Sequence, residues 1–483
     1  MKLIKKTVSV LALLFVVFAM TGCAELLGKI AGKIEEETPD PVTPSIDYED
    51  EYSFIVHYEK TQNLNVTAKA EDKGVLSFQW YKGTTDKRED ATQIVGTTEL
   101  EKANAKSPIY LFTASDKEET LYFWCKVTNT NLATGKKAEN WSDRYKVTVS
   151  NIIRLNGEHI SSNTVWLPIY TYYITSWLSV DKTLEIPAGT VVKFGKDAYM
   201  ETNGNGVIAV TGSEEKPVIF TSYLDNVGIT IPEFEGSATK AAKGDWKGIE
   251  INGAQNSTFL NAEFRYANVA ALRLRETTNV SKCLFINNKS DDDFSGALTI
   301  EENANESIVL NNVFYNNDWP LFVSANYSVD DSNVFHKPKD KPEDPDVINK
   351  YQAIVMDGGK HIKKSTVVDW KVKELPYVLK DSWVNVDTGA TLNIGDASKN
   401  VIVKFYKDCY LEVDEGGTFT LGAGSILTSW KDDTHGGDIE ANGQPAAPAD
   451  GDWDGIYMNG SWKNDINTDT TRVLYNNKEN YQD

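Results

Sequence analysis

Three consecutive aspartates, Asp291, Asp292 and Asp293, form the clearest group in this sequence that could do chemistry. Clustered carboxylates bind Ca²⁺ through their oxygens, and a pair of them can supply the acid and the base of glycoside cleavage. A run of aspartates in a loop is also a common solvated turn, so calcium is a candidate cofactor beside that plainer interpretation. No Ser-His-Asp or Cys-His set accompanies the run, and the five histidines do not pair at metal-ligand spacing. The sequence therefore assigns no catalytic residue.

Aromatic side chains near residue 170 form a second group, because flat rings with a polar edge can stack on sugars. Tyr172 and Tyr173 lie in this stretch together with Trp177. Trp177 returns as Trp383 later in the chain, which indicates a structural role, whereas the two tyrosines do not return. Tyr172 and Tyr173 are therefore the candidates for glycan contacts.

The N-terminus of the chain has the features of an export signal. Three lysines within Met1–Lys6 precede an apolar run that is too short to span a membrane comfortably and suits a signal peptide. Residues 20–23, MTGC, resemble the lipobox of bacterial lipoproteins, with methionine in place of the usual leucine. The resemblance implies a signal over residues 1–23 and a lipid on Cys23. The alternative is an ordinary cleaved signal with a chance cysteine.

Residues 24–47 end in acids and prolines and are expected to tether the folded part to the membrane. We therefore expect an exported monomer that its lipid anchors to the bacterial envelope. It would face the periplasm or the cell surface at the outer membrane. The net charge of −21, from 49 basic and 70 acidic residues, argues against nucleic acid as a partner. Three cysteines besides Cys23 and no CxxC motif argue against a disulfide framework or a structural zinc site.

A duplicated stretch organises the second half of the chain. GDWKGIEING at 244–253 returns as GDWDGIYMNG at 451–460, with seven of ten positions identical. Other motifs return in the same order, which indicates a duplication with copies at 151–345 and 350–483. The variable positions change charge or polarity, as from Lys247 to Asp454, while Gly, Asp, Trp and Ile stay. We interpret the stretch as a structural corner and not as a duplicated active site.

A finer period appears inside the first copy. Phenylalanines recur at 264, 285, 314 and 335, with spacings of 21, 29 and 21 residues, and Asn288 and Asn317 follow two of them. Short strands on coils of twenty-odd residues predict a parallel β-helix with an internal aromatic stack and asparagines at the turns. The pattern TLxIxxGTVVKF, KPVIFTS, GDWxGI resembles right-handed parallel β-helix proteins of bacterial surfaces.

Residues 48–150 show short alternating strands, which predict an all-β sandwich. Trp80 and Cys125 resemble the strand C tryptophan and strand F cysteine of immunoglobulin-like domains. No cysteine lies on the expected partner strand, and Phe123 replaces the usual tyrosine, so no disulfide is predicted. We expect Trp80 in an apolar core, with Cys125 as a small buried hydrophobe.

The predicted fold class is thus all-β, an Ig-like sandwich followed by a right-handed parallel β-helix in two related copies. The leading functional hypothesis is a surface binding or adhesin-like protein, or a structural one, without catalysis. Its expected partners are a glycan, host matrix or another envelope protein, besides the membrane that its lipid enters. The β-helix resemblance also implies an alternative, a polysaccharide lyase or glycoside hydrolase that Ca²⁺ assists.

Overall fold

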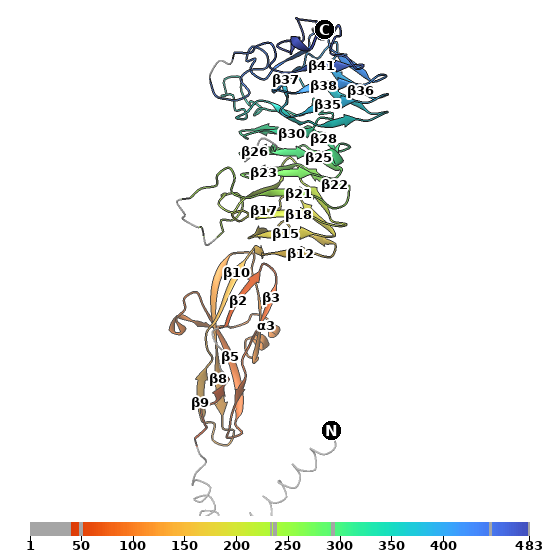
Figure 1. The fold of residues 1–483 in the computed structure, drawn as a ribbon. Helices are drawn as coiled ribbons and strands as arrows, with labels where there is room; N and C mark the ends of the chain where they lie inside the picture. The colour runs from red at the N-terminus through yellow and green to blue at the C-terminus, as the bar shows by residue number, and fades with distance from the viewer. Residues whose placement is uncertain are drawn as a thin grey trace, which may run out of the picture. The chain divides into compact units, whose positions relative to one another are not determined.

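The computed structural model describes residues 40–47, 52–231, 234, 239–290, 295–443 and 447–481. The described chain is almost entirely β-structure and forms two compact units, one up to Ser150 and one from Asn151 (Figure 1). Within these ranges no helix is long and apolar enough to cross a membrane. Cys23 and the run Asp291–Asp293 lie outside the described residues.

The first unit is built on one large sheet. Its order is β2 (Tyr52–His57), β10 (Tyr145–Ser150), β8 (Glu119–Thr130), β5 (Val75–Gly83) and β6 (Thr92–Gln93), and β9 (Lys137–Trp141) also pairs with β8. Two small sheets accompany it, β3 (Thr61–Asn65) with β7 (Ile109–Thr113) and β1 (Ser45–Ile46) with β4 (Ala68–Lys69). The helices are η1 (Arg88–Asp90) and α3 (Glu99–Asn104). Thr98 begins α3 with a capping box, in which its side chain and that of Glu101 satisfy each other's backbone N–H groups.

Trp80 and Cys125 face each other across β5 and β8 in the core of this unit. Neither side chain is exposed, and the indole N–H of Trp80 donates to the Ser107 carbonyl at 2.8 Å. Cys125 is a free thiol whose pKa burial raises to about 12, so it is unreactive at neutral pH. The prediction of a buried tryptophan with a small buried cysteine is confirmed, while the Ig-like assignment stays a prediction.

The second unit is a right-handed parallel β-helix, and its first copy has three sheets. The first strands of the coils are β11 (Ile152–Leu155), β14 (Thr171–Ile174), β17 (Val191–Phe194), β20 (Val218–Ser222), β23 (Ala262–Arg265), β26 (Leu284–Ile286) and β29 (Val313–Tyr315). The second strands are β12 (Glu158–Ile160), β15 (Trp177–Val180), β18 (Tyr199–Thr202), β21 (Gly248–Ile251), β24 (Leu272–Leu274), β27 (Leu298–Ile300) and β30 (Leu321–Ser324). The third strands are β13 (Thr164–Val165), β16 (Thr183–Pro187), β19 (Val207–Thr211), β22 (Ser257–Leu260), β25 (Thr278–Ser281) and β28 (Ile308–Leu310).

The second copy repeats this order in shorter form. Its first strands are β31 (Ile354–Asp357), β34 (Tyr377–Leu379), β37 (Ile402–Phe405) and β40 (Ile426–Ser429). Its second strands are β32 (Lys360–Ile362), β35 (Trp383–Val386), β38 (Tyr410–Val413) and β41 (Gly455–Met458), and its third are β33 (Val367–Trp370), β36 (Thr391–Ile394) and β39 (Thr418–Leu421). The described residues also include the short helices η3 (Glu302–Ala304), in a turn after β27, and η4 (Lys478–Tyr481), which follows the last strand.

The predicted aromatic stack runs through the interior. Phe264 lies 4.8 Å from Phe285, Phe285 lies 4.7 Å from Phe314, and Phe314 lies 5.4 Å from Phe335, with the rings nearly parallel. Phe220 extends the stack at its lower end, 5.2 Å from Phe264. All of these rings are fully buried, so the 21- and 29-residue spacings each bring the chain back to the same interior position.

A ladder of buried asparagine amides runs beside the rings. Asn288 donates to the Asn317 side-chain oxygen at 2.9 Å, and Asn317 donates to that of Asn349 at 2.9 Å. The same amides also bond backbone groups of neighbouring coils, as Asn317 does with the Phe285 carbonyl. The hydrogen-bonding groups of each of these turns are thereby satisfied by groups of the neighbouring coil, as predicted for Asn288 and Asn317.

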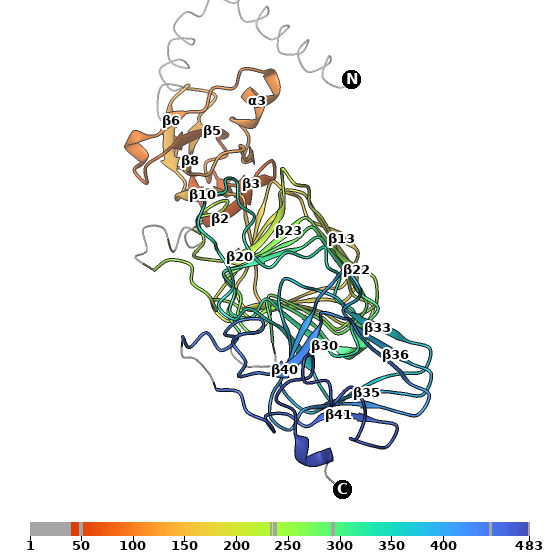
Figure 2. The ribbon, with the colours of Figure 1, turned by 90° about the horizontal axis from the view of Figure 1, so that it is seen from above.

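Corresponding strands of the two copies lie in different sheets of the β-helix. β21 and β41 carry the same duplicated stretch, yet β21 belongs to the eleven-stranded sheet and β41 to a separate four-stranded sheet. The first strand of the second copy, β31, pairs with the second-position strand β30. Viewed as in Figure 2, β33 and β36 of the second copy project to a different position from β13 and β22 of the first copy. A duplicated sequence therefore does not place equivalent residues on one surface.

The duplicated stretch forms a corner in both copies, as predicted. The Asp245 carboxylate accepts from the Ser222 hydroxyl at 2.6 Å, and Asp452 accepts from Ser429 at 2.7 Å. Gly248 has a φ of +108°, and a Cβ there would lie 1.8 Å from the Ala270 carbonyl oxygen. Only glycine fits that position, because any side chain would meet backbone.

Candidate functional site

The surface of the β-helix is hollowed at the seam between the two copies, as it also is beside Lys282 on the first copy. The sheets that contain β28 and β29 end here, those that contain β32 and β33 begin, and only the eleven-stranded sheet continues across. Of the pockets at this seam, two share the turn residues Glu302 and Asn303.

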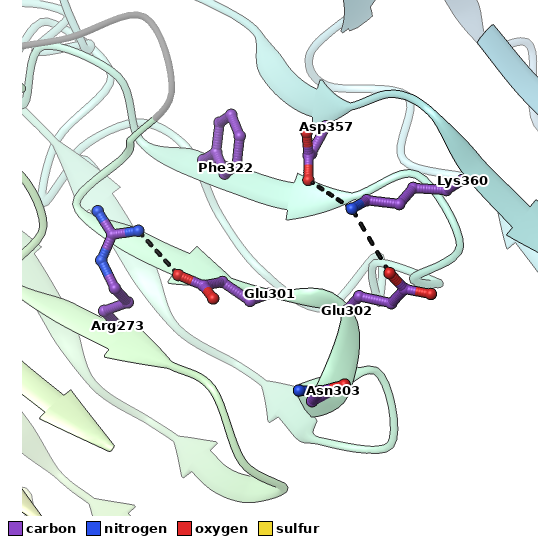
Figure 3. Close-up of a pocket in the computed structure, with 7 residues that line it drawn as sticks. All are labelled: Arg273, Glu301, Glu302, Asn303, Phe322, Asp357 and Lys360. Carbon is purple, nitrogen blue, oxygen red and sulfur yellow. Dashed lines mark hydrogen bonds and ion pairs between the residues drawn. The ribbon is translucent and has the colours of Figure 1, made fainter. Parts of the chain in front are cut away.

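The first of them, called here the seam pocket, has a volume of about 390 Å³. Figure 3 shows the residues that line it: Arg273, Glu301, Glu302, Asn303, Phe322, Asp357 and Lys360. Strand alternation positions them, because Arg273 lies between the buried Leu272 and Leu274 and must point outward. Phe322 is outward for the same reason on β30, although neighbouring side chains leave it only 5% exposed.

Glu301 holds two arginines at one edge of the seam pocket. Its Oε1 lies 3.0 Å from Arg273 Nη1 and 3.1 Å from Arg275 Nε, and Arg275 also contacts Glu250 at 3.1 Å. Burial by itself would lower the pKa of Arg275, but the hydrogen bond to Glu301 and the nearby carboxylates raise it overall. The result is a network of ion pairs that spans β21, β24 and the end of β27.

Lys360 holds the opposite edge. Its Nζ lies 3.1 Å from Asp357 and 3.5 Å from Glu302. Partial burial would lower the pKa of Lys360, but the hydrogen bond and charge of Asp357, together with the charge of Glu302, raise it. Each carboxylate that lines the seam pocket is therefore paired with a cation.

The second pocket, called here the asparagine pocket, has a volume of about 230 Å³. Its lining residues are Glu302, Asn303, Asn305, Asn326, His361, Lys363 and Thr366. Asn326 is 8% exposed, and its side-chain oxygen has no hydrogen-bond partner among the described residues. A buried acceptor without a donor costs free energy unless another molecule supplies the hydrogen bond.

His361 is fixed at the rim of the asparagine pocket. Its Nδ1 lies 2.7 Å from the Asp387 carboxylate, and its ring packs edge-on against Trp383. His159 makes the same two contacts in the first copy, with Asp181 at 2.8 Å and with Trp177. Because the arrangement recurs where the asparagine pocket does not, we interpret these histidines as structural.

The chemistry available at the seam is hydrogen bonding and charge pairing. Within the described ranges, no group of three or more His, Cys, Asp or Glu side chains could hold a metal ion. The carboxamides, carboxylates, guanidinium groups and ammonium groups there can each donate to or accept from a hydroxyl. This is a surface that can bind a polar chain.

Tyr172 and Tyr173 do not reach this surface. Tyr172 is 4% exposed, stacks on Trp166 at 4.0 Å, and accepts a hydrogen bond from the Leu167 backbone N–H at 2.7 Å. Tyr173 is 8% exposed and packs under Ile231, which belongs to the long loop after β20. Neither ring offers an open face to a sugar, because core packing and the loop already cover it.

Asp432 lies in the loop after β40, and its side chain is buried. Its carboxylate accepts from the hydroxyls of Thr428 and Thr434, at 2.7 and 2.5 Å, and lies 2.7 Å from His435 Nδ1. Burial raises the pKa of Asp432, but these hydrogen bonds outweigh it and lower the pKa overall. The carboxylate therefore stays ionised and holds the loop after β40.

The seam residues were missed by sequence reasoning. One signal was present: Glu301, Glu302 and Asn303 directly follow the strand GALTI at 296–300. A second was the stretch 325–353, in which the regular spacing of strands lapses before the second copy begins. Neither signal shows that residues 301–303 would lie at one pocket with residues of the second copy.

Two solved structures resemble the chain. Pectate lyase PelI from Erwinia chrysanthemi, in complex with tetragalacturonic acid, is 10% identical with a TM-score of 0.15, over 80% of this chain and 89% of that one. Pectate lyase Pel3 from Pectobacterium carotovorum is 9% identical with a TM-score of 0.12, over 80% and 92%. No protein-family model matches the sequence, and no curated protein does. At these values the two structures carry no argument about activity, and the strand pairing itself establishes the β-helix.

Proposed function

We propose that the chain is a lipid-anchored envelope protein that binds a glycan along the seam of its β-helix and performs no catalysis. The lipobox at 20–23 and the tether at 24–47 support export and anchoring. The acidic body suits a soluble surface outside the cytoplasm. A host matrix protein or another envelope protein is the alternative partner.

One observation carries the choice of binding over catalysis: the charged groups of the seam pocket are paired with one another. A general acid must hold a proton that it can donate, but both guanidinium groups of Arg273 and Arg275 already bond the Glu301 carboxylate. Lys360 likewise bonds Asp357 and Glu302, so each carboxylate that lines the pocket is engaged with a cation. The same groups remain competent to bind hydroxyls.

Binding of the purified full chain to a glycan array and to a panel of matrix proteins tests the proposal. We expect retention on one glycan class, and at least tenfold weaker binding for Arg273→Ala, because an arginine hydrogen bond to a ligand and its ion pairs are lost together. Lys282→Ala is the matched control, since Lys282 is an exposed cation on the same β-helix outside both seam pockets. Binding to neither panel would reject the proposal.

The enzyme alternative rests on the run Asp291–Asp293, which lies in the chain between β26 and β27, the strand that leads into Glu301. Three adjacent carboxylates could bind Ca²⁺ through their oxygens. A panel of polysaccharides, incubated with and without Ca²⁺, separates the two functions. Chain cleavage that Asp292→Ala abolishes would replace binding by catalysis.

A further inference from the structure

We propose that the seam pocket and the asparagine pocket are neighbouring subsites for two successive units of one neutral, hydroxyl-rich glycan. The inference rests on the proposed glycan binding and adds the class of sugar, the minimum length of the ligand and the residue that recognises its second unit.

The two pockets are joined through one turn. Glu302 and Asn303 of η3 line both pockets, and Figure 3 shows the two side chains on the turn at the border of the seam pocket. η3 begins after Glu301 and is fixed by Ala304, which is fully buried. A ligand unit held in one pocket therefore lies beside the other pocket, and a linear chain can occupy both.

Asn326 marks the asparagine pocket as a site for a hydrogen-bond donor. Its side-chain oxygen has no partner within the described residues, although the side chain is more than nine-tenths buried. Asn288, Asn312 and Asn317, three buried asparagines at turns of the first copy, all have donors for this oxygen. The buried oxygens of Asn151 and Asn385 also have no partner within the described residues, but neither residue lines the seam pocket or the asparagine pocket. The Asn326 oxygen borders a pocket, where a ligand hydroxyl can supply the missing donor.

The charges around the seam favour a neutral ligand. Three carboxylates but only two cations line the seam pocket, and those cations are already paired. The whole chain carries a net charge of −21, which repels an anionic polymer at long range. Lys363 is a further cation, at the asparagine pocket, and would favour an acidic sugar, so the experiment includes acidic probes.

The experiment measures the affinity of the full chain for neutral oligosaccharides of one to four hexose or N-acetylhexosamine units, with uronic acid oligomers of the same lengths beside them. We expect affinity to rise at least tenfold from one unit to two. Asn326→Ala should remove that gain and leave the affinity for a single unit unchanged. Thr366→Val, which deletes a hydroxyl from the same pocket, is the second variant if Asn326→Ala does not fold. Lys364→Ala is the control, because Lys364 is exposed beside Lys363 but lines neither pocket.

The outcomes distinguish failure of the two-subsite inference from failure of the proposed glycan binding. Failure of every probe to bind rejects glycan binding itself, and the inference with it. Binding that Arg273→Ala weakens but that neither ligand length nor the Asn326 and Thr366 variants affect rejects the two-subsite inference alone. Tighter binding of uronic acid oligomers, weakened by salt, overturns the neutral class.

Discussion

The indole ring of Trp246 lies 4.0 Å from the ring of Phe194, with the two planes 10° apart, at the corner that the duplicated stretch forms. Trp453 repeats the contact with Phe405 at 4.2 Å and 9°. Each indole N–H also donates to a backbone carbonyl of the following coil, that of Arg265 in the first copy. The tryptophan side chain thus contacts both the preceding and the following strand layer of the β-helix.

Trp246→Ala should lower the free energy of unfolding of the β-helix by about 3–5 kcal/mol, because a large ring leaves a cavity and a buried carbonyl loses its donor. Denaturant unfolding followed by circular dichroism measures the change. Lys247→Ala, at the exposed neighbouring position, should change the free energy by less than about 0.5 kcal/mol. Equal effects of the two substitutions would contradict the role of Trp246.

Asn317→Ala should destabilise the β-helix by at least about 3 kcal/mol. The amide of Asn317 accepts from Asn288 and donates to Asn349 and to the Phe285 carbonyl, and all of these buried groups lose a partner. Asn279→Ala, on an exposed position of β25, is the matched control. Similar melting temperatures for the two variants would show that the amide ladder contributes little.

Lys193 should make stability depend on alkaline pH. Lys193 belongs to β17, and its side chain is fully buried. Its Nζ donates to the Asp225 backbone carbonyl at 2.6 Å, and burial lowers the pKa of Lys193 to about 8. Between pH 8 and about 10.5 the unfolded chain binds more protons at this lysine than the folded chain does, so the free energy of unfolding rises with pH, by roughly 3 kcal/mol at most.

Unfolding of the wild type and of Lys193→Met, compared at pH 8 and pH 10, isolates this contribution. The stability of the wild type relative to the variant should increase with pH, since the tyrosines and other lysines titrate equally in both chains. A pH-independent difference would mean that Lys193 keeps its ordinary pKa in the folded protein.

Cys23 should carry the lipid. Cells that produce the full chain and take up a palmitate analogue should label the protein, and Cys23→Ala should lose the label and the membrane association together, because lipid chains supply the anchoring free energy. Cys125→Ala is the control, since that thiol is buried in the first unit. Undiminished labelling of Cys23→Ala would reject the anchor.

Much of the fold could be predicted because a β-helix is a local periodic structure. The spacing from Phe264 to Phe285 and Phe314 sets the length of a coil, so the interior stack follows from the positions of these residues alone. The corner at Trp246 could be predicted for a related reason. A residue that must be glycine or tryptophan for steric reasons stays the same when its coil is copied, as Gly248 shows.

The tyrosines near residue 170 show where this reasoning stops. The sequence identifies Tyr172 and Tyr173 as aromatic and unrepeated, but exposure depends on what covers them. Ile231 covers Tyr173 from a loop almost sixty residues further along the chain, and no local pattern shows where that loop folds.

By itself the sequence determined that coils form, how long they are, which residues face inward and that the coil-forming unit was copied. Only the tertiary structure decided on which face the second copy would begin, because the path of residues 325–353 between β30 and β31 sets that rotation. That choice brings Arg273 and Glu301 of one copy beside Lys360 of the other. The candidate site is therefore a product of how two copies join, and neither copy contains it alone.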